Sequence, residues 1–170
     1  VGAPKWNPSY AAGDNTCFVV TSADEFQAAI DAGKTDIKFA ASGSPYDLSA
    51  SSIKISQPMH INGEVVDGKY PVVNITQIDL SGEIGNLLIE NISFVGDENN
   101  NFINVASAIN AKQIIVRNCT VEKIKKSLYY HSKDIPSSIA SVVFRNVMAK
   151  EFGNGQGTID IRGGEHTNIS

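Results

Sequence analysis

The fold is decided by three similar stretches of sequence, which read Asn86-Leu-Leu-Ile-Glu-Asn-Ile-Ser-Phe94, Gln113-Ile-Ile-Val-Arg-Asn-Cys-Thr-Val121 and Ser141-Val-Val-Phe-Arg-Asn-Val-Met-Ala149. Each contains a short β-prone run, a charged residue, an Asn and a second short run. The Asn stands at positions 91, 118 and 146, which are 27 and then 28 residues apart, and a fourth copy begins at Asn168-Ile169-Ser170. A fixed period of this length is typical of repeat architectures, because one unit cannot bury its apolar face without stacked neighbours.

Apolar residues alternate with polar ones on both sides of each Asn, as expected for β-strands. The residues expected to face inward are Leu87, Ile89, Ile92 and Phe94 in the first copy, Ile114, Val116, Cys119 and Val121 in the second, and Val142, Phe144, Val147 and Ala149 in the third. The alternation shifts phase at the Asn, which predicts that this residue turns the chain between two strands. Asn tolerates the left-handed backbone conformation that such a corner needs, and stacked Asn side chains can hydrogen-bond one another as a ladder.

A second series of apolar pairs lies between these stretches. It consists of Ile53/Ile55, Ile78/Leu80, Ile103/Val105, Leu128/Tyr130 and Ile159/Ile161, whose first members are 25, 25, 25 and 31 residues apart. The last step is longer because two connections, at 132–140 and 150–157, are lengthened. Three short strands and three corners per coil predict a parallel β-helix of about 27 residues per coil, with successive coils about 4.8 Å apart.

One amphipathic helix is expected before the repeats. Ser22 and Glu25 have the spacing of a capping box, Phe26, Ala29 and Ile30 follow at helical spacing, and Gly33 supplies the stop. Such a helix would cover the first open end of the stacked core. We therefore predict an all-β domain at 17–170 with one N-terminal capping α-helix, truncated at its C-terminal end, and a linker at 1–16 that leads from an upstream domain in the same protein.

Composition excludes several classes of protein. With 42% hydrophobic and 19% charged residues the chain is an ordinary globular one. A net charge of −4 argues against nucleic acid as a partner, and no apolar run is long enough for a transmembrane segment. The two cysteines, Cys17 and Cys119, lack metal-ligand spacing, and their redox state is left open. Cys119 occupies a repeat position that predicts a small buried hydrophobic residue.

The chain resembles the pectate-lyase-like right-handed β-helices. The resemblance is carried by the helix at 22–32, the phrase Ile53-Lys-Ile-Ser-Gln-Pro-Met-His-Ile-Asn-Gly63 and the Leu-x-Ile-x-Asn-x-x-Phe repeats. More narrowly, it resembles uncharacterised β-helix domains that follow fibronectin-type modules in cell-surface lipoproteins of glycan-degrading bacteria. This implies a right-handed coil, a secreted or bacterial cell-surface location with a lipoprotein anchor in a preceding part, and polysaccharide as partner. The catalytic signatures of the family are not visible in this sequence.

Candidate chemistry lies on the outward positions of the second series, where such folds carry their substrate groove. The expected outward columns are Lys54, Asp79, Asn104, Tyr129 and Asp160, and Ser56, Ser81, Ala106, His131 and Arg162. Cleavage of a uronate by elimination needs a base near the acidic C–H and a cation that neutralises the carboxylate. Tyr129 or His131 would be the base and Arg162 the cation, beside Asp160. The alternative is a solvated polar face.

Four further residues are candidates for substrate binding. Asp79 and Asn104 lie in the same outward column, and Arg117 and Arg145 follow Glu90 in a column of charges on the repeated stretches. Glu90 can pair with Arg117, whereas Arg117 over Arg145 is unfavourable unless an anion such as an acidic glycan intervenes. Beside them, Leu88, Ile115 and Val143 form an outward apolar stripe, which suggests cover by a loop, a domain or a partner.

No cofactor is evident, although calcium stays open. Asp79 and Asp160 are three coils apart, about 14 Å, which is too far to share an ion, and the oxygen-rich loop at 96–101 could hold a cation or be a solvated turn. Three functions remain: a lyase or hydrolase acting on acidic polysaccharide, a non-catalytic surface module that binds glycan or spaces other domains, and a structural module that docks a partner on the apolar stripe.

Overall fold

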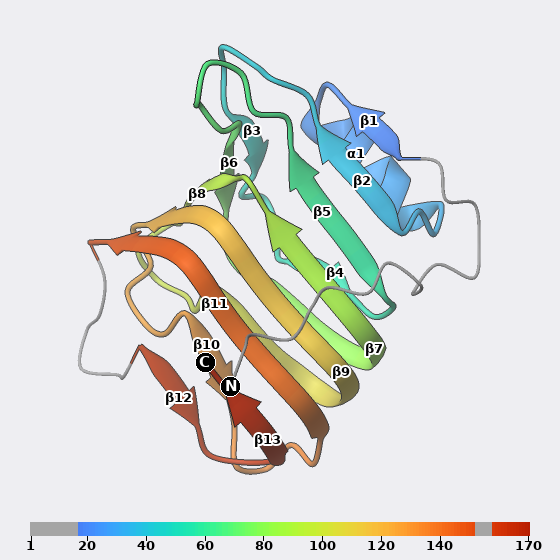
Figure 1. Ribbon diagram of the computed structural model, residues 1–170, viewed down its shortest axis with the longest axis vertical. Coiled ribbons are helices and arrows are strands. Elements are labelled where there is room, and N and C mark those ends of the chain that lie inside the picture. Colours follow the sequence, from blue (N-terminus) through green and yellow to red (C-terminus); the bar gives the residue numbers. More distant parts are fainter. Residues whose placement is uncertain (1–16, 152–157) are drawn as a thin grey trace.

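The computed structural model describes residues 17–151 and 158–170 and has the form of a parallel β-solenoid of about five coils (Figure 1). Its elements are β1 (Phe18–Val20), α1 (Ala23–Asp31), β2 (Asp36–Phe39), β3 (Tyr46–Leu48), β4 (Ile53–Ile55), β5 (Met59–Gly63), β6 (Val72–Ile75), β7 (Ile78–Glu90), β8 (Ser93–Val95), β9 (Ile103–Glu122), β10 (Tyr129–His131), β11 (Ser138–Lys150), β12 (Ile159–Ile161) and β13 (Glu165–Ile169). All named strands that pair do so in parallel, each with its counterpart one coil away, as the repeat period predicts. The predicted linker at 1–16 lies outside the described residues.

The coils stack into three faces. Face A contains β4, the first residues of β7 and β9, β10 and β12. Face B contains β1, β2, β5, the later part of β7, the middle of β9 and β11, and β13. Face C contains β3, β6, β8 and the ends of β9 and β11. Because β7 and β9 run without a break through the bend between faces A and B, the predicted separate short strands are joined there into long ones.

The corner between faces B and C is built from Asn residues, as predicted. Asn91, Asn118 and Asn146 have φ angles of 58°, 52° and 52°. Their side chains form a ladder: Asn118 Nδ2 donates to Asn91 Oδ1 at 3.3 Å, and Asn146 Nδ2 donates to Asn118 Oδ1 at 3.0 Å. The ladder extends one coil further than the sequence suggested, because Asn91 Nδ2 donates to Asn62 Oδ1 at 2.9 Å.

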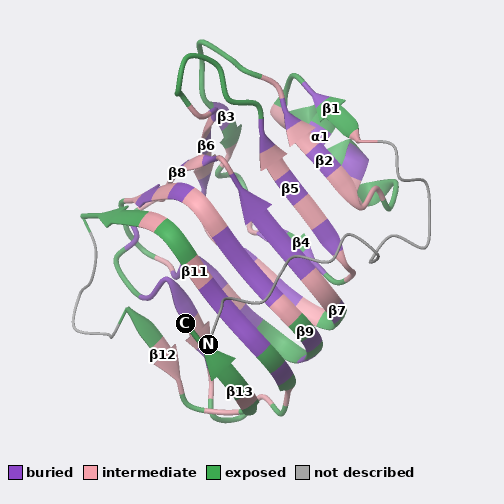
Figure 2. Ribbon diagram, viewed as in Figure 1, coloured by how far each residue is buried: buried purple, intermediate pink, exposed green. Residues whose placement is uncertain are grey.

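Aliphatic and aromatic side chains fill the interior of the solenoid, which we call the bore. Helix α1 covers the bore at the first coil. Ser22 is the helix N-cap and accepts a hydrogen bond from Glu25 N, and Gly33 follows the helix with a φ of 73°. The helix inserts Phe26, which is fully buried, against the Phe39 ring at a centroid distance of 4.7 Å. The predicted capping role of this helix is thus confirmed. Figure 2 shows buried residues running along β7, β9 and β11, whereas β12 and β13 are exposed or intermediate.

One predicted register is wrong by a single residue. Tyr129 pairs with Ile103 and His131 with Val105, so both side chains face the bore and have 0% exposure, whereas Tyr130 faces outward. The connection before β10 is one residue longer than its predecessors, so β10 begins at Tyr129 and not at Leu128. Because side chains in a strand alternate, a one-residue slip exchanges the inside and outside sets.

The apolar stripe on face B is buried. Leu88, Ile115 and Val143 are 0–5% exposed and form a small cluster of their own, separate from the bore. A search of the described helices finds none that is long and apolar enough to cross a membrane.

Candidate functional site

The outer surface of face A carries a column of polar side chains, one from each of five coils. In order along the axis they are Lys54, Asp79, Asn104, Tyr130 and Asp160. This is the expected outward column except that Tyr130 stands in the place of Tyr129. The stacking of the coils spaces these residues by about 4.8 Å, so the column is a regular row along the solenoid.

The lower part of this row combines an aromatic ring with a guanidinium group. Arg162 donates to both carboxylate oxygens of Asp160, from Nε at 2.9 Å and from Nη2 at 2.8 Å. Its guanidinium carbon also lies 5.7 Å from the centroid of the Tyr130 ring. The predicted outward positions of Asp160 and Arg162 are confirmed. Arg162 is exposed, but its charge is already matched by Asp160, which weakens it as a clamp for a substrate carboxylate.

The upper part of the row is a fixed hydrogen-bonding group. Asp79 Oδ1 accepts a hydrogen bond from Asn104 Nδ2 at 2.8 Å and another from Gln77 Nε2 at 2.8 Å. These amides hold the carboxylate in place at the surface. The remaining hydrogen-bond donors and acceptors of the amide and carboxylate groups on such a face can bond to hydroxyl groups of a ligand.

The two predicted bases do not lie on this surface. Tyr129 and His131 face the bore, where both lie within 3.4 Å of His166 Nε2 of β13 and His131 also contacts the carbonyl oxygen of Ile135 at 2.7 Å. Burial raises the pKa of the Tyr129 phenol above its ordinary value, so this group is a poor base. A polymer lying on face A reaches neither side chain, and face A therefore brings together Asp79, Asn104, Asp160 and Arg162 without Tyr129 and His131.

Face B carries a chain of titratable side chains that crosses four coils. Arg117 Nε donates to Glu90 Oε2 at 2.5 Å, and His60 Nε2 lies 2.9 Å from Glu90 Oε1. On its other side, His60 Nδ1 lies 3.2 Å from Asp36 Oδ1. Burial alone would raise the pKa of Glu90, but hydrogen bonds from His60 and Arg117, together with the charges of both, hold this pKa below its ordinary value.

Arg145 continues the same column beyond Arg117. The two residues are direct partners in the parallel register, and Arg145 is exposed. The predicted Glu90–Arg117 ion pair is confirmed. Arg117 and Arg145 are adjacent, and Glu90 pairs with Arg117. Sequence reasoning missed His60 and Asp36 as members of this network. The alternation of inward and outward residues in the strands at 36–39 and 59–63 could have identified them. It places Asp36 and His60 at outward positions, in the same column as Leu88.

The two thiols are in different environments. Cys119 is 2% exposed in the bore, and burial raises its pKa to about 12, so it is the inert buried residue that the sequence predicts. Cys17 lies at the start of face B, where burial and the nearby charge of Asp36 raise its pKa. Both are free cysteines, and neither has the lowered pKa of a reactive thiol.

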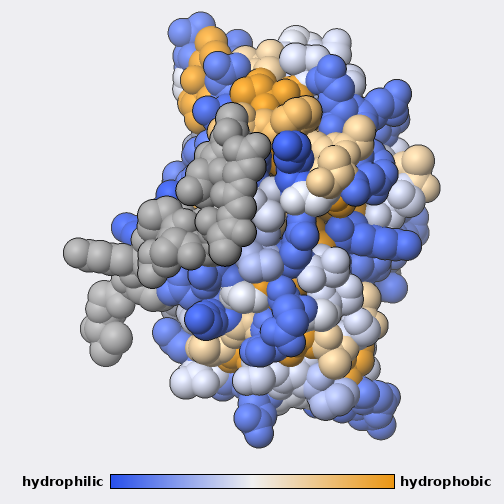
Figure 3. Space-filling model, turned by 90° about the vertical axis from the view of Figure 1, so that its right-hand side faces the viewer, coloured by the Kyte–Doolittle hydropathy of each residue, from blue (hydrophilic) through white to orange (hydrophobic). Residues whose placement is uncertain are grey.

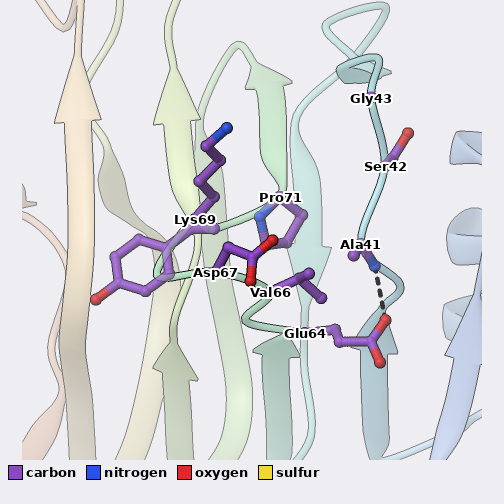
Figure 4. A pocket seen from close by; sticks show the side chains of 9 residues that line it. Ala41, Ser42, Gly43, Glu64, Val66, Asp67, Lys69 and Pro71 are labelled. Atoms are coloured by element: carbon purple, nitrogen blue, oxygen red, sulfur yellow. Dashed lines mark hydrogen bonds between the residues drawn. The ribbon is translucent and has the colours of Figure 1, made fainter.

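A hollow of about 270 Å³ lies near the α1 end of the molecule (Figure 4). Glu64, Asp67 and Lys69 are among its lining residues, and the Glu64 carboxylate accepts a hydrogen bond from Ala41 N at 2.8 Å. Its volume is below that of most ligand pockets. On the side of the solenoid shown in Figure 3, hydrophilic and hydrophobic residues are interspersed. Hydrophobic residues gather toward the α1 end, and hydrophilic ones are more frequent in the middle.

The oxygen-rich loop at 96–101 bonds to itself. Asp97 accepts hydrogen bonds from Asn99 N at 3.0 Å and from Asn100 Nδ2 at 3.2 Å. Within 17–151 and 158–170, no group of three or more His, Cys, Asp or Glu side chains could hold a metal ion.

Protein-family models, curated proteins and solved structures were compared with this chain. None of them matches it. The resemblance to the pectate-lyase-like β-helices therefore stays a hypothesis that the repeat residues carry. What the geometry offers is two faces that carry columns of polar side chains along a parallel solenoid, one with an aromatic ring and one with adjacent arginines.

Proposed function

We propose that this chain is a polysaccharide-binding domain whose glycan lies along face A. The observation that carries the proposal is the partly exposed row of Asp79, Asn104, Tyr130 and Asp160 on face A, with the exposed Arg162 beside the Tyr130 ring. A pyranose ring stacks on an aromatic face, and its hydroxyl groups bond to amides and carboxylates beside it. A row that repeats once per coil, about every 4.8 Å, suits an extended polymer better than a compact ligand.

The proposal is for binding without cleavage. Tyr129 and His131, the bases that a lyase would use here, are inside the bore. Lyase or hydrolase activity would need a base from elsewhere. A secreted or cell-surface location, and membership of the pectate-lyase-like right-handed β-helices, belong to the same proposal and are supported by the resemblance of the repeats.

Binding to a panel of soluble polysaccharides, measured by affinity electrophoresis and calorimetry, tests the proposal. Tyr130→Ala should weaken binding of the retained glycan about tenfold, since loss of a ring contact costs about 1–2 kcal/mol. Tyr70→Ala is the matched control, because Tyr70 is a partly exposed tyrosine that lines the hollow near α1. If Tyr70→Ala abolishes retention and Tyr130→Ala leaves it intact, the glycan does not bind on face A. If no polysaccharide is retained at all, a spacer or adhesion module is favoured.

A second candidate is an acidic glycan on face B. Arg145 lies beside Arg117, and, among the described residues, the ion pairs of these two cations involve a single carboxylate, Glu90. An anionic polymer would relieve their repulsion. If this face binds, uronate polymers are retained more strongly than neutral ones, retention falls with salt, and Arg145→Ala weakens it whereas Tyr130→Ala does not.

A further inference from the structure

A cluster of three polar side chains lies inside the bore, away from both outer faces. Tyr129 and His131 come from β10, and His166 comes from β13 on the opposite part of the coil. His131 Nδ1 is 3.4 Å from His166 Nε2, and the Tyr129 hydroxyl is 3.3 Å from the same nitrogen. Tyr129 and His131 are fully buried, and His166 is half-buried.

The hydrogen bond on the far side of His131 determines where its lone pair points. His131 Nε2 lies 2.7 Å from the carbonyl oxygen of Ile135. A carbonyl only accepts, so Nε2 carries the proton and, in the neutral ring, Nδ1 presents its lone pair to His166. A metal-binding histidine typically donates its other ring N–H to a carbonyl or carboxylate in this way. The hydrogen bond from His131 Nε2 to the Ile135 carbonyl is therefore of the kind that orients a metal-binding histidine.

The spacing of the cluster fits metal ligands better than hydrogen bonds. Hydrogen bonds with N–H donors are usually about 2.7–3.2 Å long, so the two contacts to His166 lie just beyond this range. In a tetrahedral site with metal–nitrogen distances of about 2.0–2.1 Å, two ligands lie about 3.3–3.4 Å apart. Both measured separations fall on this value.

The backbone near the cluster leaves room for the His131 ring. Gly164 has a φ of 70°, and a Cβ there would lie 2.3 Å from His131 Cε1. Any larger residue would displace the ring. The close passage of the chain at Gly164 thus holds His131 in the orientation that faces His166.

We propose that His131 and His166 bind one divalent transition-metal ion in the bore, with the Tyr129 hydroxyl directed at the ion and solvent completing the coordination. Imidazole nitrogen is a good ligand for zinc, copper and nickel. The two imidazole nitrogens therefore serve as the principal ligands. The ion would link β10 of face A to β13 of face B across the bore.

The test uses the whole chain, stripped of metal and titrated with Zn²⁺ by calorimetry and thermal unfolding. The chain has three histidines in all, His60, His131 and His166, which makes the controls simple. His166→Ala removes a half-buried ligand from the cluster, and His60→Gln removes the histidine of face B. A Cys17→Ser background removes the more accessible thiol.

We expect one equivalent of Zn²⁺ to raise the unfolding temperature. His166→Ala should weaken binding more than tenfold and abolish the rise, whereas His60→Gln keeps both. In ¹⁵N spectra of the histidine rings, Zn²⁺ should shift Nδ1 of His131 and Nε2 of His166. Absence of saturable binding, binding that survives in His166→Ala, or ring shifts at His60 instead would each overturn the proposal.

Discussion

At the residue scale, Asn118 combines two properties that other side chains rarely share. It holds a left-handed backbone conformation with a φ of 52°, and its amide bonds to the coil above and to the coil below. Gly satisfies the first property but not the second. The repeat of Asn at this position therefore has a physical cause that the spacing of the sequence already suggests.

Replacement of ladder residues by Gly isolates the side-chain hydrogen bonds. Asn118 takes part in two ladder bonds and Asn146 in one, and Gly adopts the backbone conformation of both. We expect Asn118→Gly to lower the free energy of unfolding by about 1 kcal/mol more than Asn146→Gly, which is the net contribution of one hydrogen bond. Urea unfolding measures the difference. Equal losses would mean that the ladder bonds add nothing beyond the corner conformation.

Single residues also mark the limit of what the sequence predicts. The bore positions of the repeats and the Asn corners follow from alternation and were predicted. Tyr129 and Tyr130 are adjacent aromatic residues after an irregular connection, and either could begin a strand. Which of the two faces inward depends on how many residues the turn at 123–128 uses, and tertiary packing decides that number. For this reason Tyr129 and His131, predicted on the outer surface, lie in the bore.

At the scale of elements, α1 acts as the end wall of the bore. Phe26 stacks on Phe39, whose ring in turn lies 4.8 Å from that of Tyr46. The sequence predicts the helix from its cap and its apolar spacing. One detail goes beyond a simple capping box, because the Glu25 carboxylate accepts a hydrogen bond from the backbone N of Thr21 at 2.6 Å.

Truncation of Phe26 should open this end of the solenoid. The side chain is fully buried, and Phe→Ala changes in cores cost about 3–5 kcal/mol. We expect Phe26→Ala to lower the free energy of unfolding by this amount. Phe18→Ala is the control, since Phe18 is 39% exposed on β1 of the same coil. A small loss for Phe26→Ala would show that the stack of coils is stable without the helix.

At the scale of the whole molecule, face B links coils through charge as well as through backbone hydrogen bonds. The chain of contacts from Asp36 through His60 and Glu90 to Arg117 crosses four coils. Glu90 is at its centre and is 8% exposed. The sequence predicts the Glu90–Arg117 pair from adjacency in the repeat, but His60 belongs to an earlier, less regular coil and escapes the pattern.

The lowered pKa of Glu90 gives the stability of the solenoid a defined dependence on pH. A carboxyl whose pKa is lower in the folded state than its ordinary value of 4.5 stabilises the fold above that pH. This contribution is lost as the pH falls from about 4.5 through the lower folded pKa. Glu90→Gln lacks the charge at every pH, so it should be less stable than the parent at pH 7 by about 1–2 kcal/mol.

The difference between the parent and Glu90→Gln should therefore shrink as the pH is lowered below 4.5, because the parent's Glu90 becomes protonated and resembles Gln. Urea unfolding at a series of pH values from 7 to 3 measures it. Glu83→Gln is the control, since Glu83 is an exposed carboxyl on β7, bonded to Asn110. A difference that stays constant with pH would mean that Glu90 acts through packing and not through its charge, and would remove the electrostatic link between the four coils.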